Sequence, residues 1–200
     1  MLNERKIVSR RMFNGDQETF TPGKTALMVV LIVVVLIVAY FVRKNIRRAQ
    51  YGDEYIRMGI AKERKQQYEE AVNYYMAAES AYRESGSDEG RARAYYLAGM
   101  LESKCEDHEE AMKYYHQAEP IARVASQPED LAFLLMNMGG TEEELCNMEE
   151  ARKYYMDAME VYEKLGDREG VLFAWDKLNL EMDKSNSERK EESNDVEETE

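Results

Sequence analysis

The side chains best suited to chemistry in this chain are a cysteine with a histidine three residues later, a second histidine, and repeated pairs of glutamates. Cys105 and His108 have a spacing seen at metal sites. His116, however, lies eight residues beyond His108, whereas two ligands on adjacent turns of one helix stand four residues apart. No second Cys-x-x-Cys or Cys-x-x-His motif is present to complete a zinc site. We therefore expect neither a metal ion nor another cofactor.

Pairs of adjacent glutamates could serve general acid–base chemistry, yet they recur at equivalent places in a repeated pattern. Glu109-Glu110 and Glu149-Glu150 both fall at the start of predicted helices, where the helix dipole stabilises carboxylates. Helix capping therefore accounts for these pairs. The sequence also contains no phosphate-binding loop and no nucleophile elbow. We expect that the protein is not an enzyme and has no small-molecule substrate.

These glutamates belong to a motif that recurs every 40 residues. Each copy reads Glu-Glu-Ala, then a Tyr-Tyr pair after two further residues, then another alanine. A fixed period of this size is the signature of stacked structural repeats. The pattern predicts helices near residues 52–66, 68–84, 88–105, 108–125, 128–146, 148–164 and 168–183. Pro128 suits the first turn of a helix, whereas Pro120 lies inside the fourth helix and should kink it.

Glycines and capping residues follow the same spacing. Gly59, Gly99 and Gly139 stand within predicted helices, where glycine costs about 1 kcal/mol relative to alanine. Three such glycines in register predict that neighbouring helices approach closely at these points. Asp107 and Asn147 are N-cap residue types, and each is followed at the third position by a glutamate.

An unbroken apolar run covers residues 26–42, with Lys24 before it and two basic residues directly after it. At ~1.5 Å per residue the run is ~26 Å long, near the lower limit for crossing a bilayer. Tyr40 and Phe41 stand where an interfacial aromatic belt would lie. A signal peptide and a buried core strand are the alternatives, but a signal peptide has a shorter apolar region and a small-residue cleavage site. We predict a transmembrane helix in the lipid bilayer and a single-pass membrane protein.

The other segments follow from composition. Residues 1–25 are polar and predict a disordered N-terminal tail, and 43–50 form a basic juxtamembrane linker. The repeats occupy 51–183, and the glutamate-rich residues 184–200 predict a disordered acidic tail. Slightly more Lys and Arg follow the apolar run than precede it, so the positive-inside rule favours a cytosolic repeat domain. Nothing in the sequence identifies the organelle.

Charge is divided unevenly along the chain. Residues 1–50 carry a net charge of +6, so with a total of −13 the remaining residues carry −19. Nucleic-acid binding requires a basic face, and the repeat region is strongly acidic. We therefore expect no nucleic-acid partner. The two cysteines are too few for a disulfide scaffold.

The repeats resemble the tetratricopeptide repeat (TPR) family. The second helix of each repeat fits that family's Ala-x-x-x-Phe-x-x-Ala pattern with tyrosine for phenylalanine, as in Ala71, Tyr75 and Ala78. The family's tryptophan occurs once, at Trp175, where a fourth unit would begin. The 40-residue repeat is longer than the usual 34 residues. The resemblance covers about 50–183 and implies an all-α fold, a right-handed α-solenoid of three helical hairpins and a capping helix, preceded by the transmembrane helix.

In that family the first helices of the repeats line a concave groove that binds peptides or helices. By position, the resemblance implies that the following residues face the groove here: Asp53, Ile56, Arg57, Ile60, Arg93, Tyr96, Leu97, Met100, Lys104, Phe133, Met136, Asn137 and Gly140. An apolar centre with a few basic groups suits an amphipathic helix. The alternative is that about half of these residues are core between repeats.

Some chaperone-binding TPR domains clamp a terminal carboxylate with Lys, Asn and Arg residues of these first helices. The matching positions here carry Ile56, Ile60, Leu97 and Phe133. Asn137 stands where the clamp has arginine. The resemblance therefore does not extend to a carboxylate clamp.

Taken together, these features predict a membrane-anchored adaptor or scaffold that binds a peptide or helix of a protein partner. Two alternatives remain open at this point. One is a chaperone-like assembly factor of a bacterial inner membrane, with the repeats outside the cytoplasm. The other is a structural subunit or self-association module of a membrane complex.

Overall fold

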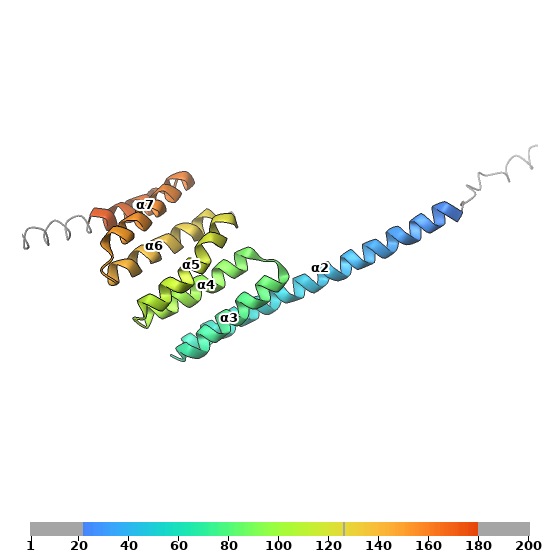
Figure 1. Cartoon of the computed structure of the whole chain (residues 1–200), viewed down its shortest axis with the longest axis horizontal. Coiled ribbons are helices and arrows are strands. Elements are labelled where there is room, and N and C mark those ends of the chain that lie inside the picture. The colour runs from blue at the N-terminus through green and yellow to red at the C-terminus, as the bar shows by residue number, and fades with distance from the viewer. Residues whose placement is uncertain (1–21, 126, 180–200) are drawn as a thin grey trace, which may run out of the picture. The chain divides into compact units, whose positions relative to one another are not determined.

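The computed structural model of the chain describes residues 22–125 and 127–179. Its described residues are almost entirely helical (Figure 1). The tails predicted for 1–25 and 184–200 lie wholly or almost wholly outside these residues.

The long helix α2 (Pro22–Glu63) contains the apolar run. The side chains of residues 26–42 are exposed along its whole length. Among the described helices, α2 is long and apolar enough to cross a membrane. A signal sequence near the N-terminus meets the same criteria of length and composition. The linker expected at 43–50 is not a separate element, because these residues continue the same helix. By contacts, the chain divides into one unit ending at Arg43 and a second beginning at Lys44.

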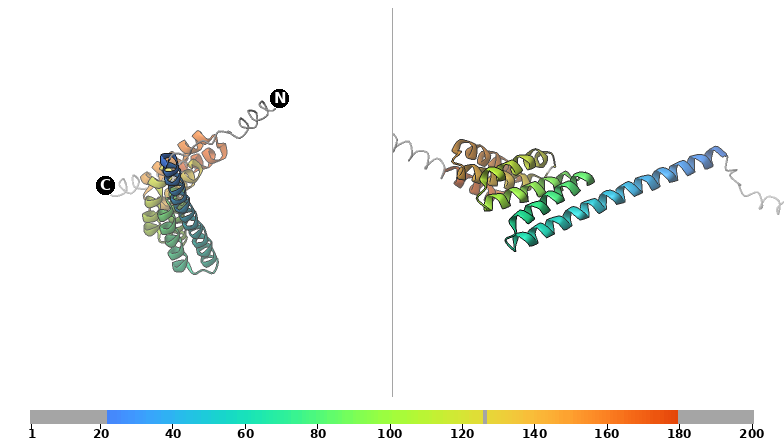
Figure 2. Two further views of the ribbon diagram at one scale, coloured as in Figure 1. Left: turned by 90° about the vertical axis from the view of Figure 1, so that its right-hand side faces the viewer. Right: turned by 60° about the horizontal axis from the view of Figure 1, so that its bottom comes forward.

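The second unit is an α-solenoid in which consecutive helices pack side by side. Its elements after α2 are α3 (Tyr68–Ser85), α4 (Asp88–Lys104), α5 (His108–Val124), α6 (Pro128–Glu144), α7 (Met148–Leu165) and a last helix whose described part is 168–179. Figures 1 and 2 show α3 to α7 stacked in chain order. The helices predicted from residue 68 onward are therefore confirmed within two residues at the described ends, whereas the helix predicted at 52–66 is the last part of α2, which begins at Pro22 and ends at Glu63. Helix α5 runs without a break through Pro120.

The second tyrosine of each Tyr-Tyr pair forms the centre of its repeat. Tyr75 and Tyr155 are fully buried, and Tyr115 is 1% exposed. Each ring lies against the mid-helix glycine of the preceding helix: a Cβ added at Gly99 would stand 2.6 Å from the ring of Tyr115. The same holds at the equivalent glycines of the other two repeats, at 2.5 Å. The predicted close approach is confirmed, and its cause is an aromatic ring packed on bare backbone.

The turn inside each repeat has one conformation, which recurs every 40 residues. Gln66, Glu106 and Cys146 all have positive φ, between 60° and 66°. The side chain of Asp107 caps α5 by accepting a hydrogen bond from the Glu110 backbone N–H at 3.1 Å, as predicted. Asn147 does not cap α7, which corrects the prediction.

The reason lies in a competing partner for the asparagine side chain. The Asn147 Nδ2 group donates a hydrogen bond of 2.7 Å to the carboxylate of Glu142, which is 8% exposed. A buried carboxylate without a partner is costly, so it takes the amide from the cap position.

Candidate binding groove

A cavity of about 390 Å³ lies between α4 and α6 and extends to the C-terminal end of α5. Four residues expected in the groove, two of them aromatic, line this first cavity together: Arg93, Tyr96, Leu97 and Phe133. Its other lining residues are Glu89, Ala92, Ala122, Ala125, Gln127, Asp130 and Leu134. Helix periodicity places the α4 residues on one face because they stand three and four positions apart. The sequence argument missed the contributions from α5 and from the start of α6.

A second, more open cavity of about 980 Å³ lies against α6, α7 and the last helix. Lys104, Met136, Asn137 and Gly140 line it, as expected for the groove. Phe133 lines both cavities and is 56% exposed, so the two adjoin at this side chain. The first helices of the second and third repeats therefore form one hollowed surface, which we call the groove.

The expected residues of the first repeat are placed differently. Ile56 is 4% exposed and belongs to the hydrophobic core, so it is not available to a partner. Ile60 is half-buried against the same core. Arg57 is exposed but lines neither cavity, and the same holds for Met100 of the second repeat. Asp53 accepts a hydrogen bond of 2.6 Å from the Tyr82 hydroxyl and so has a structural partner.

A polar contact connects the two helices of the groove. The Asn137 side-chain amide donates to the hydroxyl oxygen of Tyr96 at 3.1 Å and to the backbone carbonyl of Phe133 at 2.8 Å. Burial raises the pKa of the Tyr96 hydroxyl, so this phenol stays neutral and keeps a proton to donate. Asn137 and Tyr96 together give the apolar groove a fixed polar point.

Lys104, the lysine expected in the groove, is already paired within the chain. Lys104 Nζ lies 3.0 Å from a carboxylate oxygen of Glu63, and this hydrogen bond raises the pKa of Lys104. Its ammonium also lies 5.8 Å from the centroid of the Tyr68 ring. Lys104 therefore contributes to the packing of α4 on the first repeat.

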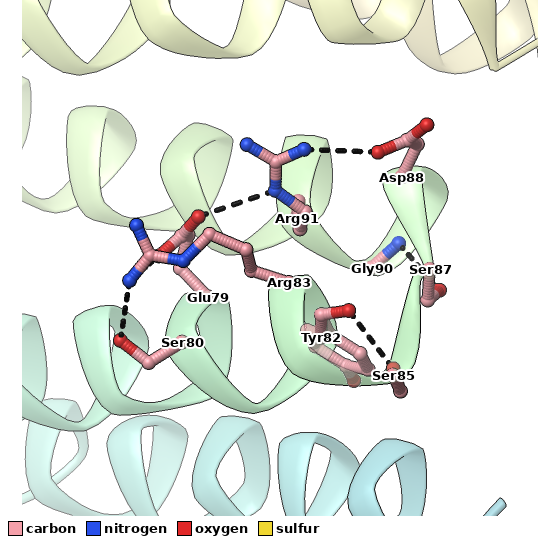
Figure 3. Close-up of polar contacts among 9 residues, drawn as sticks. All are labelled: Glu79, Ser80, Tyr82, Arg83, Ser85, Ser87, Asp88, Gly90 and Arg91. Carbon is pink, nitrogen blue, oxygen red and sulfur yellow. Dashed lines mark hydrogen bonds and ion pairs between the residues drawn. The ribbon is translucent and has the colours of Figure 1, made fainter. Parts of the chain in front are cut away.

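A separate polar cluster, which the sequence did not predict, joins α3 to α4 (Figure 3). Glu79 is 2% exposed. Its carboxylate accepts a hydrogen bond from Arg91 Nε at 3.2 Å, and the Arg83 guanidinium lies 3.6 Å from it. Arg91 also reaches Asp88 at 2.9 Å. Paired and buried in this way, the carboxylate holds two helices together and has no open face for chemistry.

The residues considered for metal binding do not gather. Among the residues that the structure describes, no group of three or more His, Cys, Asp or Glu side chains could hold a metal ion. Cys105 and Cys146 are both free and exposed.

Comparison with known proteins finds a repeat family for part of the solenoid. A tetratricopeptide repeat family model matches residues 54–123. No curated protein matches the sequence.

Several solved structures share the fold. The apo form of RapI superposes with a TM-score of 0.62 at 16% identity, covering 69% of this chain and 50% of that one. Aspartyl phosphate phosphatase F from Bacillus subtilis gives a TM-score of 0.63 at 18% identity, covering 72% and 38%. A Rap protein complexed with Competence and Sporulation Factor gives 0.57 at 17% identity, covering 71% and 40%.

A smaller neighbour matches over nearly its whole length. The C-terminal TPR-containing domain of a Plasmodium falciparum protein classed as FK506-binding has a TM-score of 0.54 at 14% identity, and the match covers 73% of this chain and 95% of that domain. The chain spans half or less of the length of the Rap-type structures. At these identities the likeness concerns the fold, and it confirms an all-α solenoid of TPR-like hairpins.

Proposed function

We propose that the protein is a membrane-anchored adaptor whose groove binds a peptide or a helix of a partner protein. TPR-type repeats and TPR-like neighbours support a protein-interaction scaffold in general. One of those neighbours, a Rap protein, is known in complex with Competence and Sporulation Factor. The apolar, fully exposed stretch of α2 supports the anchor, because so much exposed aliphatic surface needs a lipid or protein cover.

The observation that carries this proposal is the pair of adjoining cavities on the first helices of the second and third repeats. Their lining combines exposed Phe133, half-buried Tyr96 and Leu97, and the amide of Asn137. An apolar cleft with a few convergent polar groups is the usual form of a binding site. The methionine of the second cavity, Met136, adds a side chain that can adapt to different partners.

The groove supports binding rather than catalysis. In the groove the Asn137 amide donates to the Tyr96 hydroxyl oxygen, and Lys104 pairs with Glu63. One structural neighbour is named a phosphatase, but that name belongs to a protein of which this chain covers only 38%. We propose accordingly that the protein has no enzymatic activity of its own.

For orientation, we propose that the repeats lie in the cytosol, in keeping with the basic residues that follow the apolar run. Protease protection in sealed native membranes, with a tag after Glu200, tests this directly. Digestion of the solenoid from the cytosolic side supports the adaptor. Protection until the membrane is opened would favour the assembly factor with extracytoplasmic repeats.

The exposed end of the solenoid favours a second candidate function, self-association or assembly into a complex. In the last helix, Leu172 and Trp175 are 62% and 54% exposed, whereas Ala132 and Leu135, 40 residues earlier, are fully buried. The earlier residues are covered by the second helix of their own repeat. Sedimentation of the Leu172→Ser, Trp175→Ser variant against the native protein tests whether this end joins copies.

The adaptor proposal is tested by site-specific photo-crosslinking in native membranes. A benzophenone amino acid replaces Phe133 in the groove, and a matched control places it at Met156, which is 49% exposed and lines neither cavity. We expect a discrete crosslinked partner from position 133 and none, or a different set, from position 156. Equal crosslinking from both positions, or from neither, would count against the groove.

A further inference from the structure

One position in the middle repeat departs from its equivalents. Tyr82 and Tyr162 stand 80 residues apart near the ends of α3 and α7, and each is 4% exposed. The equivalent residue between them, near the end of α5, is Ala122. The middle repeat therefore lacks an aromatic ring that both neighbouring repeats bury.

The surroundings of Tyr82 show where such a ring lies. A Cβ added at Gly52 or at Gly90 would meet the ring at 2.5 and 2.3 Å, so both glycines pack directly against it. The Tyr82 hydroxyl donates to Asp53. Tyr162 repeats part of this arrangement, because its ring packs on Gly170.

The equivalent positions around Ala122 line a cavity, although two of them carry a side chain where the first repeat has a glycine. Forty residues after Gly52, Asp53 and Gly90 stand Ala92, Arg93 and Asp130. All three of these residues, together with Ala122, line the first cavity. The cavity thus lies where a tyrosine ring is packed in the first repeat, and the side chains of Ala92 and Asp130 form part of its wall.

We propose that this space receives an aromatic side chain from the partner, so that the partner supplies the ring that the middle repeat lacks. This inference rests on the function proposed above. A dry cavity of about 150 Å³ is known to hold benzene, and the first cavity measures about 390 Å³. Ala122, Leu134 and Phe133 provide apolar walls for the ring.

The charges at the cavity define what flanks the ring. Glu89, Asp130 and Arg93 line it, and none of the three forms a salt bridge within the described part of the chain. Arg93 takes the place of Asp53, so a guanidinium is available to lie over the face of an aromatic ring. The two unpaired carboxylates favour a basic residue next to the ring. The partner segment is therefore an aromatic residue flanked by lysine or arginine.

The chain's own C-terminal residues are not this occupant. Residues 180–200 contain no Phe, Tyr or Trp. Phe13 and Phe20 precede the apolar run, so in the single-pass arrangement proposed above the membrane separates them from the repeats, and the ring comes from another molecule.

The test uses the full-length protein in lipid nanodiscs and a library of random displayed peptides. Peptides that bind are measured against three proteins: the native chain, the Ala92→Gly, Ala122→Tyr, Asp130→Gly variant, and the control variant Ala92→Gly, Ala122→Ser, Asp130→Asn. The first variant copies the first repeat and fills the space, whereas the control changes the same positions and leaves it open. We expect selected peptides to carry an aromatic residue beside a basic one. We expect the filled variant to bind them at least about tenfold more weakly, and the control within about twofold.

Each result separates this inference from the function on which it rests. Peptides that bind the native and the filled proteins equally, or that tolerate replacement of their aromatic residue by alanine, overturn the inference and leave the adaptor function standing. Failure to select any peptide contradicts both. If the filled variant does not fold, the alanine replacement in the peptide decides alone, and a loss of about tenfold supports the inference.

Discussion

The first and third repeats close where the middle repeat opens. Tyr82 and Tyr162 fill the junction between the two helices of their repeat and the helix that follows, whereas Ala122 leaves a cavity at the same place. The three repeats share the central tyrosine and the glycine that faces it. The difference teaches that the common positions build the solenoid, and that a departure from them marks a place available for binding.

A second difference concerns the polar contacts between repeats. The buried ion pair of Glu79 and Arg91 becomes, 80 residues later, the apolar pair Met159 and Val171. This pair of positions therefore accepts either an ion pair or an apolar contact. Variants that exchange residues between equivalent positions of two repeats show which residues every repeat needs for stability and which belong to a single repeat.

The largest expected effect comes from the part that all repeats share. Replacing Tyr115 by alanine should destabilise the protein by about 3–5 kcal/mol, because a fully buried aromatic ring leaves a cavity behind. Urea unfolding of the full-length protein in detergent, followed by circular dichroism, measures this. The middle repeat connects the other two, so an unchanged midpoint would contradict the packing described here.

Breaking the ion pair of the first repeat should come next. The Arg91→Val variant leaves the buried Glu79 carboxylate with the longer contact to Arg83 and the hydroxyl of Tyr95, and we expect a loss of about 3 kcal/mol. The double variant Glu79→Met, Arg91→Val imports the pair of the third repeat and should restore most of that stability. A double variant as unstable as the single one would show that the repeats are not interchangeable here.

Two adjacent glycines offer a matched pair of smaller effect. Gly139→Ala places a methyl group 2.5 Å from the buried ring of Tyr155 and should cost about 1–3 kcal/mol. Gly140→Ala meets only the hydroxyl oxygen of the same tyrosine, at 3.7 Å, and should gain up to about 1 kcal/mol from helix propensity. Thermal unfolding of both variants in parallel measures the difference. Equal shifts would argue against the close helix approach.

The smallest expected change in stability concerns two glutamates at equivalent positions, Glu102 and Glu142, and for Glu102 it depends on pH. Burial, with help from Asp107 and Glu110, raises the pKa of Glu102 above its usual 4.5. The ionised form therefore costs stability at neutral pH, and this cost disappears below the usual pKa, where the side chain is protonated in both folded and unfolded states. Glu102→Gln should be slightly stabilising at pH 7 and neutral near pH 4.

The equivalent Glu142→Gln is the control. Glu142 accepts a hydrogen bond from Asn147, so losing its charge weakens a contact instead of relieving a cost, and the variant should be slightly less stable at pH 7. Urea midpoints at the two pH values give both results. A stabilised Glu142→Gln variant would show that the two sites do not differ as described.

Much of the solenoid could be predicted from the sequence because its packing repeats with the sequence period. The buried tyrosines, the glycines against them and the helix bounds all follow from one 40-residue motif. The groove was predicted only in part. Arg93, Tyr96, Leu97 and Phe133 do meet in the first cavity, but Ile56 is core.

Two features of the structure could not be predicted from the motif: the hydrogen-bond partner that a side chain takes when several are within reach, and the places where one repeat departs from the others. Asn147 has a capping residue type, yet a buried carboxylate takes its amide. An alanine near the end of a helix, such as Ala122, is ordinary in a sequence. Its importance follows from the tyrosines at the equivalent positions, Tyr82 and Tyr162, and from the cavity that Ala122 lines. Departures from a repeat therefore carried more information about the site than the repeat itself.

The most direct test of the central claim is cysteine labelling at the open position. In the full-length protein with Cys105 and Cys146 changed to serine, a small thiol reagent is applied to Ala122→Cys and, as a control one turn away, to Ala118→Cys, which replaces a fully buried alanine. The account predicts that position 122 reacts in the folded protein while position 118 reacts only after unfolding. Equal protection of both thiols would mean that the cavity is closed in solution and would contradict the account.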